Sequence, residues 1–176
     1  MGSQTLAAWV QAIGSIATII GAYFLGERQG SIALRNSRLL AKDAEQIKRD
    51  SILEIARMAV DRATEIGTLF SDQPIDTVRM GANYHPSILE SRAAALSSIP
   101  VLEVGSAEGA AALLDIRDQL VFLRNAVQQW SDGRSKSGNA GSGDRLQWDA
   151  VWCTNVRTHI TCIERHFESL KAALQP

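Results

Sequence analysis

The sequence has little of the chemistry that marks an enzyme or a disulfide-stabilised secreted domain. Its 176 residues include only two cysteines and three histidines, and the formal net charge is −1. Cys153 and Cys162 lie nine residues apart in a predicted helix and point to opposite sides, so they cannot pair with each other there, which suits a reducing cytoplasm. A near-neutral charge gives no general attraction to nucleic acid. A phosphate-binding glycine loop and a nucleophile elbow are also missing. We therefore expect no catalytic residues, no cofactor, no bound metal and no nucleic-acid partner.

Strand-forming patterns are nearly absent as well, because only residues 101–104 have the composition of an extended segment. Apolar residues instead recur at helical spacing. The predicted helices run up to about residue 70 and over 87–98, 106–130 and 145–174. Proline and glycine predict a loop at 71–86, and the Gly/Ser-rich residues 131–144 predict a mobile loop. The fold class is therefore all-α, with a bundle of about four helices after residue 50.

Charged residues are missing altogether from residues 6–25, LAAWVQAIGSIATIIGAYFL. A helix of this length spans about 30 Å, which is the hydrocarbon thickness of a bilayer. Trp9 and Tyr23 lie near its two ends, where aromatic rings anchor at the membrane interfaces. The stretch therefore predicts a transmembrane helix. A cleaved signal peptide and a buried helix of a soluble protein are the alternatives.

Basic residues follow this stretch and none precedes it. The following 25 residues contain Arg28, Arg35, Arg38, Lys42, Lys48 and Arg49. The positive-inside rule then places the N-terminus outside and the C-terminal body in the cytoplasm, at the inner membrane of a bacterium. The expected organisation is a transmembrane anchor at 1–26, a juxtamembrane helix at 27–50 and a cytoplasmic helical bundle at 51–176.

Small and polar residues form one side of the apolar stretch, at steps of four and three. We call these positions the seam: Ala7, Gln11, Gly14, Thr18 and Gly21. In lipid, small side chains let helices approach closely and polar side chains hydrogen-bond between them. The seam therefore predicts an oligomerisation surface and a homo-oligomer. The alternative is chance alignment, since glycine and alanine are common in membrane helices.

Basic residues continue below the seam at a seven-residue step. They are Arg28, Arg35, Lys42 and Arg49. On one continuous helix they would lie roughly on the side of the seam, so close packing of copies would bring like charges together. A kink at Gly26 or Gly30, a wide ring with a basic vestibule, or anionic lipid headgroups held between copies would relieve this repulsion.

Three tryptophans, Trp130, Trp148 and Trp152, gather around the Gly/Ser-rich residues. Trp148 lies off the apolar stripe of the last predicted helix, so its indole is a candidate anchor for a cytoplasmic protein partner. The alternative is that Trp148 covers the end of the bundle.

Two further patterns involve histidine. His159, Cys162 and His166 share one side of the last predicted helix and carry zinc-ligand chemistry, but they flank the apolar stripe without a fourth ligand. Arg79 and His85 resemble the Arg-x4–6-His motif of HEPN-type ribonucleases, which are also helical bundles. The resemblance implies ribonuclease activity, although the family places its motif on a late helix rather than in a predicted loop.

Residues 9–20, WVQAIGSIATII, resemble the start of many short bacterial and prophage-encoded membrane proteins. The overall plan also resembles membrane effectors of bacterial antiviral systems, including the small membrane partner of an RNA-targeting CRISPR nuclease. These resemblances imply a single N-terminal anchor before a helical region. We expect a membrane-anchored, non-enzymatic protein that acts by self-association or partner recruitment. An oligomeric pore and a ribonuclease are the alternatives.

Overall fold

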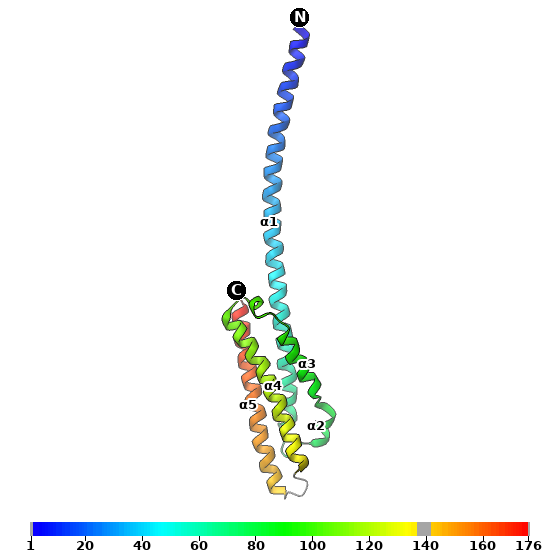
Figure 1. The fold of residues 1–176 in the computed structure, drawn as a ribbon, viewed down its shortest axis with the longest axis vertical. Helices are drawn as coiled ribbons and strands as arrows, with labels where there is room; N and C mark the ends of the chain where they lie inside the picture. The colour runs from blue at the N-terminus through cyan, green and yellow to red at the C-terminus, as the bar shows by residue number, and fades with distance from the viewer. Residues whose placement is uncertain (1, 137–141, 176) are drawn as a thin grey trace. The chain divides into compact units, whose positions relative to one another are not determined.

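A computed structural model describes residues 2–136 and 142–175, and within this part the side chains of residues 2–8, 10, 12, 13, 17, 136 and 142 are not described. The elements are α1 (Gly2–Leu69), α2 (Thr77–Asn83), α3 (Pro86–Ser97), the 3-10 helix η1 (Val101–Val104), α4 (Ala107–Lys136) and α5 (Ser142–Leu174) (Figure 1). The described residues form helices and no strand, so the prediction of an all-α fold is confirmed.

The chain divides into two units, Met1–Ile47 and Lys48–Pro176. The first unit consists of most of α1, which contains no break at Gly26 or Gly30. The second unit contains the end of α1 and all the other helices. Among the side chains that the structure describes, the hydrophobic core lies in the second unit.

The core forms where apolar stripes of three long helical segments meet. α4 and α5 lie side by side in opposite directions (Figure 1). The apolar residues that recur every three or four positions along α4 are completely buried: Leu113, Ile116, Leu120, Leu123, Val127 and Trp130. The stripe of α5 is buried at Val156, Ile160, Ile163, Leu170 and Leu174, with Trp152 and Phe167 partly buried. The end of α1 contributes Ile52, Ala56, Ala59, Ala63 and Ile66, so the apolar residues at helical spacing form the core.

The predicted loop at 71–86 is wrong in part, because it contains the helix α2. The carboxylate of Asp76 caps this helix by accepting hydrogen bonds from the backbone N–H groups of Val78 and Arg79. Such a cap satisfies donors that the first helical turn leaves free, which offsets the low helix propensity of Gly81. Residues 101–104 are also not extended, since they form η1.

The predicted loop at 131–144 is shorter than expected at both ends. Residues 131–136 continue α4 and residues 142–144 begin α5, while residues 137–141 lie outside the described residues. Two side-chain interactions hold the extra turns of α4. Gln128 donates a hydrogen bond to Asp132 over 2.8 Å, and Arg134 pairs with Asp149 of α5. The second partner is distant in sequence, so a local pattern could not indicate it.

Within the described residues, no helix is long and apolar enough to cross a membrane. The expected span, residues 6–25, belongs only partly to that description, because the side chains of residues 6–8, 10, 12, 13 and 17 lie outside it. The predicted transmembrane anchor is therefore not confirmed and stays a prediction.

Candidate functional site

The seam lies on the first unit, within α1. Gln11, Gly14 and Thr18 are exposed and Gly21 is partly buried, while the side chain of Ala7 lies outside the described residues. The hydroxyl of Thr18 donates to the carbonyl oxygen of Gly14 over 2.8 Å. A side chain added at Gly14 or Gly21 would meet nothing within 4 Å, so the glycines leave open space along this side of the helix.

Large apolar side chains on the same part of α1 are uncovered. Those more than half exposed between residues 9 and 25 are Trp9, Ile16, Ile19, Ile20, Tyr23, Phe24 and Leu25. Solvent-exposed apolar groups are common singly, but a cluster of this size is typical of surfaces that bind a membrane or another protein. The first unit is part of one helix, and none of its described side chains belongs to the buried core.

The predicted basic series continues along α1. Arg28, Arg35 and Lys42 are exposed in the first unit, and Arg49 is partly buried in the second. Arg35, Arg38 and Lys42 alternate with leucines there, which makes the surface both basic and apolar. Such a surface suits the headgroup region of an anionic membrane.

The second unit contains a polar cluster that the sequence did not indicate. Asp149 is 0% exposed, which is unusual for a carboxylate. It accepts hydrogen bonds from the backbone N–H of Ile75 over 3.1 Å and from Trp130 Nε1 over 2.9 Å. Nη1 of Arg134 lies 2.7 and 2.6 Å from the two carboxylate oxygens. Asp149 thus joins the segment before α2 to α4 and α5.

A sequence signal for Asp149 existed but was missed. Asp149 lies three and seven residues before Trp152 and Val156, so it belongs to the buried stripe of α5. An ionisable residue on such a stripe needs a buried partner. Arg134 could not be recognised as that partner while residues 131–144 were expected to form a loop.

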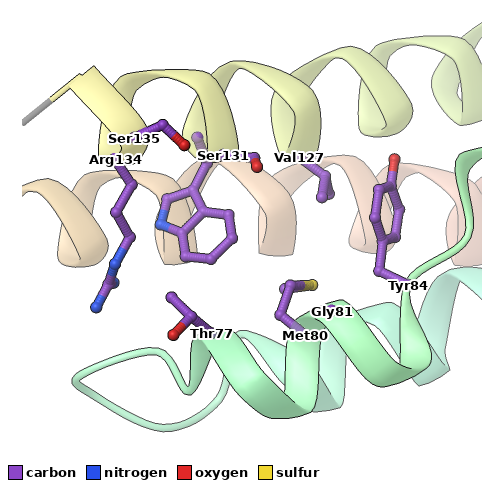
Figure 2. Close-up of a pocket in the computed structure, with 9 residues that line it drawn as sticks. Thr77, Met80, Gly81, Tyr84, Val127, Ser131, Arg134 and Ser135 are labelled. Carbon is purple, nitrogen blue, oxygen red and sulfur yellow. The ribbon is translucent and has the colours of Figure 1, made fainter.

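A hollow of about 380 Å³ opens beside this cluster, between α2 and α4. Figure 2 shows lining residues of α2 and its C-cap on one side (Thr77, Met80, Gly81 and Tyr84) and of α4 on the other (Val127, Ser131, Arg134 and Ser135). Trp130 of α4 also lines the hollow. The guanidinium of Arg134 lies 5.5 Å from the centroid of the Trp130 ring. Burial is the main cause that raises the pKa of Tyr84 to about 12, so its phenol is neutral at physiological pH.

Trp148 lies at the start of α5, with its ring centroid 5.6 Å from that of Trp152. Its side chain is 37% exposed, and a Cβ added at Gly133 of α4 would overlap its ring. The indole therefore lies against the last turns of α4 and keeps part of its surface free. A role of Trp148 in holding a partner stays a prediction.

The three residues with zinc-ligand chemistry have separate partners. His159 Nδ1 lies 2.8 Å from Gln119 Oε1, His166 Nδ1 lies 3.4 Å from Asp115 Oδ2, and Cys162 accepts a weak hydrogen bond from Arg165. The described residues include no group of three or more His, Cys, Asp and Glu side chains that could hold a metal ion.

The two residues of the ribonuclease resemblance lie on different elements. Arg79 belongs to α2 and pairs with Asp72 over 3.6 Å, while His85 is the N-cap residue of α3. A catalytic role for this pair stays a prediction.

No protein-family model matches the sequence, and no match to it was found among the curated proteins or the solved structures. A proposal for its function therefore rests on the residues and their geometry alone.

Proposed function

We propose that this chain is a membrane-anchored, non-enzymatic helical protein that acts by self-association or partner recruitment at the bacterial inner membrane. The main support for this proposal is the run of exposed large apolar side chains between Trp9 and Leu25 of α1. A helix that is apolar on most sides must be buried in lipid or in protein. None of the described side chains of the first unit belongs to the buried core, which supports a cover of lipid or of another protein.

The polar side chains of this stretch are compatible with lipid. The hydroxyls of Ser15 and Thr18 donate to the carbonyl oxygens of Gln11 and Gly14, four residues earlier. A polar group without a partner is costly in the hydrocarbon core, and these bonds remove two such donors. The side-chain amide of Gln11 has no hydrogen bond to another described residue, so it is available to bond to a second copy through the seam.

The charge pattern supports one orientation. Exposed Arg28, Arg35 and Lys42 follow the apolar residues directly along α1. Basic residues flanking a span favour the cytoplasmic side, and each contributes about 1 kcal/mol near an anionic leaflet. The helical body from Lys48 onward would then face the cytoplasm.

Membrane extraction tests the anchor. Full-length protein expressed in bacteria should stay with the membrane pellet after an alkaline carbonate wash. Ile16→Arg, near the middle of the stretch, should move it to the supernatant, because a central arginine costs about 2.5–3.5 kcal/mol of insertion. Leu102→Arg is the matched control, since Leu102 is 96% exposed on η1 in the second unit.

Two results would contradict the anchor. If carbonate releases the wild type, the apolar helix is covered by protein rather than lipid. If Ile16→Arg and Leu102→Arg behave alike, residues 9–25 do not hold the protein at the membrane.

A further inference from the structure

The hollow between α2 and α4 has the size of a small-molecule site. Its volume is about 380 Å³, within the range of roughly 300–1,000 Å³ that ligand pockets occupy. All its lining residues belong to the second unit, whose core is independent of the apolar part of α1. The hollow is therefore a feature separate from the proposed anchor.

Both walls of the hollow include apolar core residues. Val127 and Trp130 of α4 and Met80 of α2 line it, and each is no more than 5% exposed. Gly81 lies beside Met80 on the α2 wall in Figure 2, and a Cβ there would meet nothing within 4 Å. An indole across from a thioether and a glycine backbone suits a flat aromatic ring.

Hydrogen-bonding groups around the hollow are available. The hydroxyls of Thr77, Ser131 and Ser135 make no hydrogen bond with any residue that the structure describes. The Tyr84 hydroxyl reaches only the carbonyl oxygen of Arg124, at 3.5 Å. A ligand could therefore bond to several hydroxyls without breaking an existing strong interaction.

The charge of the hollow favours an anion. Arg134 is the cation that lines it, and no carboxylate does, because Asp149 is fully buried behind the guanidinium. Asp149 bonds to Nη1 of Arg134 only, which leaves Nε and Nη2 without a hydrogen bond among the described residues. The guanidinium is thus fixed in place, with donors left over for a second anionic group.

We propose that this hollow binds a small planar aromatic molecule bearing one anionic group, with the ring between Gly81 and Trp130 and the anion on Arg134. The other side of Arg134 keeps its bond to Asp149. The bound molecule would therefore add a contact across α2 and α4 at the point where Asp149 already joins three segments.

The test uses 2-naphthoate as the probe and the full-length protein labelled with ¹⁵N at tryptophan, in detergent micelles. The indole N–H of Trp130 bonds to buried Asp149, so its resonance reports on the hollow. Naphthoate should shift this resonance saturably. Neutral 2-naphthol should bind about tenfold more weakly, because it lacks the charge-assisted bond to Arg134. Equal affinity of the two probes would overturn the assignment of Arg134.

A second experiment fills the hollow with a large side chain. Gly81→Phe should abolish the naphthoate shift while the melting temperature is kept, whereas Gly143→Phe on α5, where a Cβ also meets nothing within 4 Å, should leave binding unchanged. If Gly81→Phe disturbs α2, Thr77→Phe closes the same hollow from its exposed end. The site would be refuted if a variant with a filled hollow folds normally and still binds naphthoate. It would also be refuted if naphthoate does not shift the Trp130 resonance of the wild type.

Discussion

At the scale of single residues, a substitution of Asp149 would remove several buried hydrogen bonds at once. Its carboxylate satisfies the Ile75 N–H, the Trp130 indole N–H and the Arg134 guanidinium in a site with no exposure to solvent. Removing one partner of a buried ion pair leaves the other charge without compensation. The cluster therefore makes the second unit sensitive to substitution at this position.

We expect Asp149→Ala to lower the free energy of unfolding by about 3–5 kcal/mol, which is the cost of breaking a buried pair. Urea denaturation followed by circular dichroism measures the loss. Asp132→Asn on exposed α4 surface is the control and should cost about 1 kcal/mol or less. If Asp149→Ala lowers the free energy of unfolding by less than about 1 kcal/mol, water would satisfy the donors that the carboxylate satisfies in the wild type.

His159 should make stability depend on pH. Burial lowers the pKa of its imidazole below the usual 6.5. The unfolded chain therefore binds a proton at a higher pH than the folded chain does. This contribution to stability is fully present above about pH 6.5 and is lost as the pH falls toward the lowered pKa. Melting temperatures between pH 8 and pH 5 should fall less steeply in His159→Gln than in the wild type. An unchanged slope would assign the effect to another group.

At the scale of elements, the packing of α5 against the last turns of α4 requires a glycine at position 133. Gly133 leaves room for the Trp148 ring, which a Cβ would overlap. On α2, by contrast, a Cβ at Gly81 meets nothing. Two chemically identical changes in helices should therefore have opposite effects.

We expect Gly133→Ala to destabilise the protein, because overpacking costs about 1–3 kcal/mol and the gain in helix propensity is only about 1 kcal/mol. Gly81→Ala should stabilise it by up to about 1 kcal/mol. Urea midpoints of both variants in the same detergent measure the difference. If Gly133→Ala is neutral, Trp148 moves aside easily, which would favour its predicted role as an exposed anchor for a partner.

At the scale of the whole molecule, the proposed self-association depends on the seam. Gly14 and Gly21 leave the space that close helix packing in lipid requires. Gly14→Leu should reduce the mass of the detergent-solubilised full-length protein to that of a monomer. Gly30→Leu, on the other side of α1 and also in open space, is the control. Light scattering measures the mass of both variants. An unchanged mass in Gly14→Leu would mean that the seam is not an interface, and the oligomer and pore proposals would then lose their support.

Sequence periodicity predicted the long helices well but not their ends. The stripes of α4 and α5 repeat every three or four residues, and this spacing is a property of the helix itself. Helix ends depend on single interactions instead. Asp76 begins α2 within an expected loop, and Arg134 extends α4 through its bond to Asp149. Proline and glycine at 71–86 and the Gly/Ser-rich composition at 131–144 predicted loops instead, because composition reports only the average local propensity.

The sequence by itself determined the all-α class, the buried faces and the uncharged stretch at residues 6–25, because each is a local pattern along the chain. Only the tertiary structure decided the polar cluster and the hollow. Ile75, Trp130 and Arg134 are separated from Asp149 by 74, 19 and 15 residues, and no repeat relates them. A buried charge is tolerated only where such distant donors converge, so packing of α2, α4 and α5 had to be known before the cluster could be recognised.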